Sequence, residues 1–144
     1  MTVERDGKQQ KVGVTRAHLE EDVAKLQHSR DGAGAGFALM DVNRAGVPLM
    51  EVVGEPDLRT ADEAREYMTK LRSILRYIGV STADMDQGSF RCDANVSVRP
   101  KGSVGYGTKV EVKNMNSFRS VHDSIEYELA RQVKLLEEGG QVEQ

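Results

Sequence analysis

The sequence predicts an α+β fold in which helices pack on an antiparallel sheet, and two patterns carry this prediction. Residues 90–99 and 108–114 alternate apolar and polar side chains on either side of a short glycine loop, as the two strands of a hairpin do. Apolar residues recur at three- and four-residue spacing over residues 64–78 and 118–136, as on the buried side of an amphipathic helix. Because the order is strands, helix, hairpin, helix, antiparallel packing is favoured over a parallel βαβ sheet.

The first expected strand covers residues 12–16 and runs into an acidic cluster at residues 18–22, His-Leu-Glu-Glu-Asp. The ordinary explanation of this cluster is a solvated turn, or the first turn of a helix continuing to residue 25, where carboxylates complement the helix dipole. Residues 28–36 contain three glycines, Gly32, Gly34 and Gly36, which predict a flexible loop. Without a lysine-serine continuation they match a phosphate-binding loop poorly.

Two further strands are expected at residues 37–43 and 48–53, joined by residues 44–47. Glu51 interrupts the otherwise apolar second run, and a carboxylate in a half-buried strand is costly unless it is paired, hydrogen-bonded or bound to a metal. Two explanations therefore stand side by side: Glu51 faces solvent on an edge strand, or it belongs to a functional site.

Both helices carry start and stop signals. Residues 60–63, Thr-Ala-Asp-Glu, predict a capping box that begins the first helix, and Gly79 ends it. The second helix is expected to begin at Asn116 or Ser117 and to end at residues 139–140, both glycine. Its inward-facing side chains should be Phe118, Val121, Ile125, Leu129, Val133 and Leu136.

The predicted hairpin has one apolar and one strongly polar face, because side chains alternate along a strand. Together with the polar turn before it, the second face gathers Asp86, Ser89, Arg91, Asp93, Lys109, Glu111 and Lys113. Carboxylates can bind Mg²⁺, which prefers hard oxygen ligands, and lysines and arginines can neutralise charge on a transferring phosphoryl group. The face is therefore either merely solvated or an open site for an anionic, metal-bound substrate.

Composition excludes several classes of protein. The 144 residues, 38% of them hydrophobic, suffice for one domain with a real core, and no stretch approaches the roughly 20 apolar residues of a membrane span. The first eight residues are too charged for a signal peptide, so we expect a cytoplasmic protein. A net charge of −3 argues against a general nucleic-acid coat but leaves room for a local basic patch. The single cysteine, Cys92, is expected as a buried apolar residue and not as a nucleophile.

Four runs of residues resemble a known protein family. They are HLEED (18–22), DVNRAGVPL (41–49), GSFRCDANVS (88–97) and GTKVEVKNMNSF (107–118). In order and spacing these runs are similar to the B subunits of the aspartyl/glutamyl-tRNA amidotransferases. The similarity extends from about Val12 to the end of the chain.

The resemblance implies a transamidation step in translation. The side-chain carboxylate of Glu-tRNA(Gln), and often of Asp-tRNA(Asn), would be phosphorylated by ATP with Mg²⁺ and then attacked by ammonia. The A subunit would release that ammonia from glutamine, so the implied partners are the tRNA and the A and C subunits. The resemblance also implies a core similar to the glutamine synthetase fold, an antiparallel sheet backed by helices.

The resemblance further implies roles for individual residues. The expected metal ligands are Glu21 and Glu111, followed by Glu20, Glu51 and Asp93. Contacts to ATP or to the acyl-phosphate are expected from Ser89, Arg91, Asn95, Lys109 and Lys113. The residues expected to act in catalysis are Glu21, Glu111, Lys109 and Lys113.

Full members of this family carry an N-terminal Glu-x-His metal motif and C-terminal helical and tail domains that grip tRNA, which are not found in this sequence. We therefore expect residues 1–144 to be a fragment of a single catalytic (cradle) domain that is inactive alone. Gln87 stands where an acid or a lysine is common in the family, which weakens a ligand role for it. Two other functions stay open: a tRNA-binding or assembly module without chemistry, and another ATP-dependent carboxylate-amine ligase.

Overall fold

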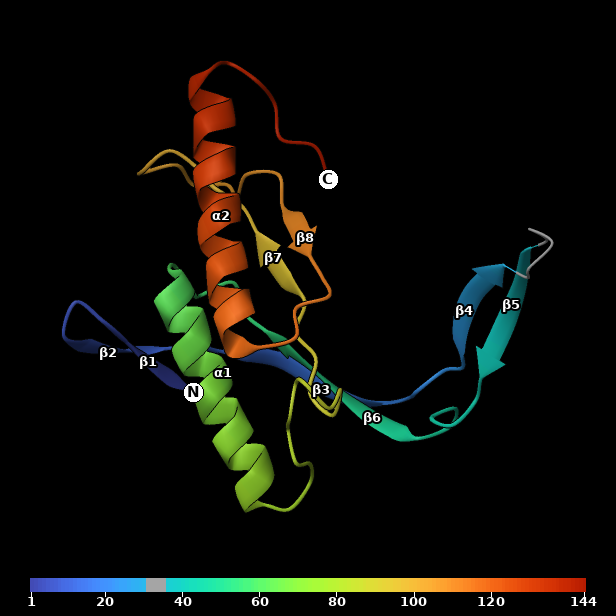
Figure 1. Ribbon diagram of the computed structural model, residues 1–144. Coiled ribbons are helices and arrows are strands. Elements are labelled where there is room, and N and C mark those ends of the chain that lie inside the picture. Colours follow the sequence, from blue (N-terminus) through green and yellow to red (C-terminus); the bar gives the residue numbers. More distant parts are fainter. Residues whose placement is uncertain (31–35) are drawn as a thin grey trace. The chain divides into compact units, whose positions relative to one another are not determined.

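The computed structural model describes residues 1–30 and 36–144, which divide into two compact units. Unit 1 comprises residues 1–12 and 57–144, and unit 2 comprises residues 13–56. Over these described residues, the four pairs of strands are antiparallel and two helices accompany them, which confirms the predicted α+β class (Figure 1). The likeness to the glutamine synthetase fold stays a prediction. Within the described residues, neither helix is long and apolar enough to cross a membrane.

Unit 1 begins with a tight hairpin of β1 (Thr2–Arg5) and β2 (Lys8–Lys11) that the sequence analysis missed. Its two-residue turn is Asp6-Gly7, and both residues have positive φ angles, 51° and 71°. An Asp-Gly pair is a strong signal for this type of turn because its backbone twist matches that of the two strands. The hairpin buries Val3 completely and so contributes to the core of unit 1.

Helix α1 (Ala61–Tyr77) starts and stops where the sequence predicts. Thr60 caps it by accepting a hydrogen bond from the Glu63 backbone N–H, and Gly79 follows its end with a φ of 73°. The Glu63 side chain is buried and accepts hydrogen bonds from the Arg59 backbone and from Arg5 of β1, which ties the first hairpin to the helix.

Helix α2 (Phe118–Glu137) begins after Ser117, as predicted, but the inward side of its second half was predicted wrongly. Val133 and Leu136 are 44% and 42% exposed, whereas Glu128 and Gln132 are buried. The physical reason is that a polar side chain can be buried when its hydrogen bonds are satisfied. Gln132 meets this condition, because its amide group bonds to the backbone of Val96 and Val98.

The predicted hairpin of β7 (Ala94–Val96) and β8 (Val110–Val112) forms, but each strand is only three residues long. The chain before β7 is a turn, in which the Phe90 N–H bonds to the Asp84 carbonyl instead of a strand partner. Figure 1 shows β7 and β8 beside α2, which in turn packs along α1. The buried core of unit 1 consists of Val3, Val12, Tyr67, Met68, Met85, Met115 and Val121.

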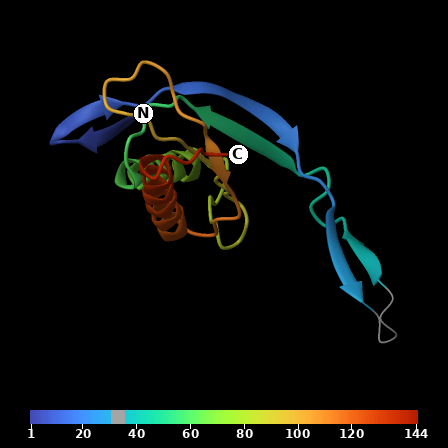
Figure 2. The same cartoon turned by 90° about the horizontal axis from the view of Figure 1, so that it is seen from above.

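Unit 2 is built from two separate two-stranded ribbons, which Figure 2 shows from above. Strand β3 (Val14–Glu21) pairs with β6 (Pro48–Gly54), and β4 (Lys25–Arg30) pairs with β5 (Gly36–Asp41). The strands predicted at 37–43 and 48–53 are therefore confirmed. They do not pair with each other, because β5 pairs with β4 and β6 pairs with β3.

Two expectations for unit 2 are wrong. The acidic cluster at residues 18–22 does not lie on a helix or in a solvated turn, because residues 18–21 form the end of β3, paired with β6, and Asp22 follows directly with its N–H bonded to the Val47 carbonyl. Residues 28–30, expected in a flexible loop, belong to β4. Gly32 and Gly34 of that predicted loop lie outside the described residues.

Candidate functional site

The outer face of the β7–β8 hairpin brings together three of the predicted site residues. The Lys113 Nζ lies 3.3 Å from Glu111 Oε2 and 3.6 Å from Asp93 Oδ2. The hydrogen bond that Lys113 donates to Glu111, reinforced by the negative charges of Glu111 and Asp93, raises the pKa of Lys113 above its usual range. Asn95 lies directly opposite Glu111 in the register of the hairpin. We call Asp93, Asn95, Lys109, Glu111 and Lys113 the hairpin face, because alternation along the chain puts all five on this side.

The opposite side of the hairpin is fastened to α2 by a buried glutamine. Gln132 is fully buried; its Nε2 donates to the Val96 carbonyl at 3.0 Å, and its Oε1 accepts from the Val98 N–H at 3.2 Å. Its Nε2 also donates to Glu128 Oε1 at 2.7 Å, and Arg131 holds both oxygens of Glu128. The hydrogen bonds from Arg131 and Gln132 lower the pKa of Glu128, so this network stays charged at neutral pH.

Cys92 lies on the buried side of the chain leading into β7, where it packs against the core of unit 1. Burial, together with the nearby charge of Asp93, raises the pKa of the thiol to about 11. Since the thiolate is the reactive form of cysteine, this environment keeps Cys92 inert at neutral pH. Cys92 is thus a partly buried residue packed against the core, less buried than predicted but on the predicted apolar side.

The other predicted residues near the hairpin have different surroundings. The Ser89 hydroxyl accepts a hydrogen bond from the Asp84 N–H at 2.9 Å and lies 2.7 Å from the Thr82 hydroxyl, so it stabilises the turn before the hairpin. Arg91 is exposed, and Asp86 lies exposed at the tip of the same turn. A role for Ser89 or Arg91 in nucleotide binding stays a prediction.

Unit 2 contains a second polar cluster, on one face of the β3–β6 ribbon. The His18 Nε2 lies 2.8 Å from Glu20 Oε1 and 3.3 Å from Glu51 Oε2, and Arg16 lies 3.6 Å from the same Glu51 oxygen. Possible ligand atoms of the histidine and the two glutamates all lie within 4.8 Å of one another. Among the described residues, the His18 Nδ1 has no hydrogen-bond partner although it is shielded from solvent.

Glu20 and Glu51 were predicted as site residues, whereas His18 was not. The missed signal is the spacing His18-x-Glu20, because residues two apart on a strand share a face. For Glu51 the structure agrees with the solvent-facing explanation, and a functional role for it stays a prediction. It is exposed on the ribbon, and it is paired with Arg16 and His18.

The neighbouring acids of the cluster point elsewhere. Alternation along β3 places Glu21 on the opposite face from Glu20, next to its register partner Pro48. Asp22 is buried and paired with Arg44 at 2.9 Å, and its backbone bonds with Val47. Asp22 is therefore structural. Glu21 lies in unit 2 and Glu111 in unit 1, so their predicted joint role as metal ligands stays a prediction.

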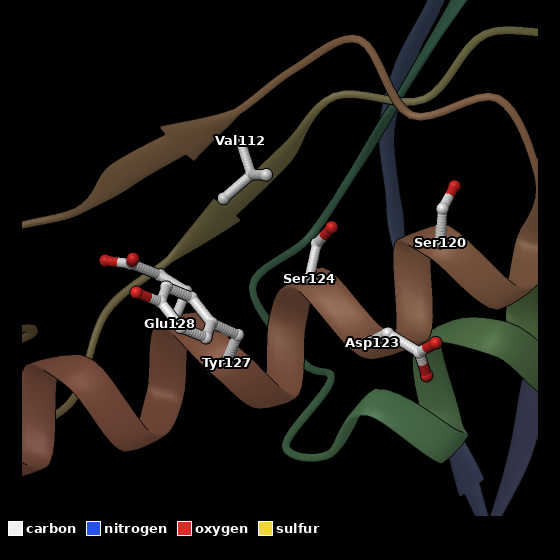
Figure 3. Close-up of a pocket in the computed structure, with 6 residues that line it drawn as sticks. All are labelled: Val112, Ser120, Asp123, Ser124, Tyr127 and Glu128. Carbon is white, nitrogen blue, oxygen red and sulfur yellow. The ribbon is translucent and has the colours of Figure 1, made fainter.

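A shallow groove of about 500 Å³ lies between β8 and α2 (Figure 3). It is lined by Val112, Ser120, Asp123, Ser124, Tyr127 and Glu128. Ser120 belongs to the capping box of α2, and Glu128 belongs to the network around Gln132. None of the predicted site residues is among those lining the groove, so it gives no support to the predicted chemistry.

Comparison with known proteins gives one consistent result. Residues 1–144 match the family model described as the GatB/GatE catalytic domain. A curated relative from Dehalococcoides mccartyi (strain ATCC BAA-2266 / KCTC 15142 / 195), the B subunit of an aspartyl/glutamyl-tRNA(Asn/Gln) amidotransferase, is 57% identical over all of this chain. Proteins of the same name from Moorella thermoacetica and from Thermoanaerobacter sp. (strain X514) are 60% and 55% identical over 96% and 99% of it. The chain spans 29% of the length of each of these relatives.

Proposed function

The chain belongs to the GatB/GatE catalytic-domain family, and from this premise we propose that it is part of the ATP-dependent catalytic core of a tRNA-dependent amidotransferase. In the proposed reaction, a side-chain carboxylate oxygen of Glu-tRNA(Gln) or Asp-tRNA(Asn) attacks the γ-phosphorus of ATP, and ADP leaves. Ammonia then attacks the carbonyl carbon, phosphate leaves, and loss of a proton gives the amide. The proposal includes a cytoplasmic location and two partners, the A subunit, which supplies ammonia from glutamine, and the C subunit.

The observation that supports this proposal best is the charge arrangement of the hairpin face. The Lys113 ammonium group lies within 4 Å of both the Asp93 and the Glu111 carboxylates, on a hairpin that Gln132 fastens to α2. Phosphoryl transfer depends on positioning and on neutralising charge, and such a face offers groups of both signs. The raised pKa of Lys113 keeps it cationic at neutral pH, which suits contact with phosphoryl oxygens.

The donor atoms of the hairpin face fit Mg²⁺. This ion prefers hard oxygen ligands and is usually held by one or two carboxylates together with substrate phosphates, and Asp93 and Glu111 offer two carboxylates on one face. The cluster of His18, Glu20 and Glu51 fits it less well, because it includes a ring nitrogen. When bound, the ion would neutralise charge on the phosphates of ATP.

The remaining side chains of the hairpin face would stabilise charge and orient the substrate. Lys109 and Lys113 would stabilise negative charge on the transferred phosphoryl group, since each carries an ammonium group on this face. The Asn95 amide, opposite Glu111, can both donate and accept hydrogen bonds and would orient the substrate. Arg91 would add a guanidinium for a bidentate contact with phosphate oxygens.

The test is made on the reconstituted full-length complex. We expect Glu111→Gln to lower the rate of ATP-dependent conversion of Glu-tRNA(Gln) to Gln-tRNA(Gln) by about 100-fold, the effect of losing one key electrostatic contact. Glu126→Gln, a matched change of an exposed glutamate on α2, should leave this rate unchanged. Glutamine hydrolysis and assembly of the complex, measured in the same samples, report whether the complex is intact.

Amidation that survives Glu111→Gln would overturn the assignment. Tight tRNA binding without any Mg²⁺-dependent nucleotide binding would favour a tRNA-binding or assembly module. ATP-dependent amidation of a free amino acid, with no action on aminoacyl-tRNA, would favour a different carboxylate-amine ligase.

A further inference from the structure

The connection between β7 and β8 concentrates positive charge. We call residues 97–109 the basic loop: it contains Arg99, Lys101 and Lys109 and no aspartate or glutamate, in a chain whose net charge is −3. Both lysines are exposed. In the part of the chain that the structure describes, no carboxylate lies within ion-pairing distance of either of them.

Contacts within the basic loop hold it in one conformation. The Arg99 guanidinium donates hydrogen bonds to the Val104 and Gly105 carbonyls, both at 3.1 Å, and lies 4.8 Å from the centre of the Tyr106 ring. This stacking supports one side of the ring and is favourable in itself. Tyr106 nevertheless remains 61% exposed and Val104 is 98% exposed, so the tip of the loop presents an aromatic and an aliphatic side chain to solvent.

A glycine fixes where the loop joins the hairpin. A Cβ atom at Gly107 would lie 2.1 Å from the Val98 carbonyl oxygen, so only glycine allows the two chains to approach this closely. Lys109 follows two residues later and lies two residues before Glu111 on the same side of the chain. The basic loop is therefore directly continuous with the hairpin face.

We propose that the basic loop binds the unpaired 3′ end of the tRNA, with Lys101 contacting a phosphate and Tyr106 stacking on a base. This inference rests on the proposed function, in which the aminoacyl group at that end must reach the hairpin face. Cationic side chains next to an exposed aromatic ring are what single-stranded nucleic acids bind, since the cations follow the backbone and the ring stacks on bases. Bases within a duplex are already stacked, so the ring selects an unpaired strand.

The experiment measures binding of uncharged tRNA to the assembled full-length complex, without ATP or glutamine, over a series of salt concentrations. We expect Lys101→Gln to lower the slope of log K against log salt by about 0.7, the loss of one phosphate contact with a single strand. Tyr106→Leu should raise the Kd about tenfold and leave this slope unchanged, and Tyr106→Phe, which keeps the ring, should bind like wild type. Lys8→Gln, a change of an exposed lysine in unit 1, serves as the matched control.

A second substrate locates the contact. With tRNA shortened by its unpaired 3′ nucleotides, Tyr106→Leu and wild type should bind equally well. If the tyrosine variant still binds the shortened tRNA more weakly, or if both loop variants match wild type on intact tRNA, the inference is overturned while the proposed function stands. A wild-type complex that binds no tRNA at all would overturn the proposed function and this inference with it.

Discussion

Replacing Gln132 with leucine should loosen the hairpin from α2. Leucine has a similar size, but it leaves the Val96 carbonyl and the Val98 N–H without their partner, and the glutamine that satisfies both is completely buried. A buried polar group left without a hydrogen bond costs about 1–3 kcal/mol, and Val98 is partly open to water, so we expect a total of about 2–4 kcal/mol. Glu128 keeps both hydrogen bonds from Arg131 and adds little to this cost.

The assay is hydrogen exchange of the full-length protein, followed in peptides that cover residues 94–98, together with its urea unfolding. We expect faster exchange in these peptides and a lower unfolding midpoint for Gln132→Leu. Gln9→Leu, at an exposed position of β2, should change neither. Unchanged exchange and an unchanged midpoint for Gln132→Leu would refute the argument that this side chain holds the hairpin to the helix.

Three further predictions concern single side chains. Gly107→Ala should cost about 2–3 kcal/mol of stability, because its new methyl group would overlap the Val98 carbonyl, and the urea unfolding midpoint measures this loss. The hydrogen bond from Arg5 lowers the pKa of Glu63, so its stabilisation is present above the ordinary pKa of a glutamate, about 4.3, and is lost as the pH falls through the lowered value. The unfolding midpoint of Glu63→Gln, measured from about pH 6 to about pH 2, should therefore fall less steeply than that of wild type. Lys113→Met should tighten Mn²⁺ binding to the full-length protein by roughly fivefold, because it removes an ammonium group that competes with the metal ion for the carboxylates of Asp93 and Glu111. Electron paramagnetic resonance of free Mn²⁺ measures this affinity. An unchanged affinity would show that Lys113 does not compete with the ion.

The helices and the hairpin were predictable because their signals are local. Thr60 and Gly79 mark the ends of α1, and β7 and β8 belong to consecutive alternating runs joined by a connection that contains glycines. The hairpin at Asp6-Gly7 was missed although its turn signal is equally local. Strand partners in unit 2 were not predictable in this way, because pairing β3 with β6 depends on contacts between residues about 30 positions apart, which no periodicity encodes.

The candidate site was predicted only in part, because local alternation shows the face of a side chain but not its partner from a distant strand. Alternation correctly put Asp93, Glu111 and Lys113 on one face, where the structure finds them in contact. The cluster around His18 was not predicted, because its partner Glu51 comes from a different strand. The burial of Gln132 was not predicted either, because a polar residue is expected to face solvent unless its hydrogen-bond partners are known. Sequence patterns thus give the face of a side chain more readily than its partner.

The hydrogen bonds between Gln132 and the chain at β7 affect which substitutions the strand tolerates. The hydrogen bonds that tie the glutamine to this part of the chain go to main-chain atoms, the Val96 carbonyl and the Val98 N–H, which do not depend on the identity of the side chains there. Mutations of the exposed side chain of Asn95 therefore leave these two hydrogen bonds in place. A library of variants at this position, proline excluded, should accordingly separate into active and inactive members that remain folded.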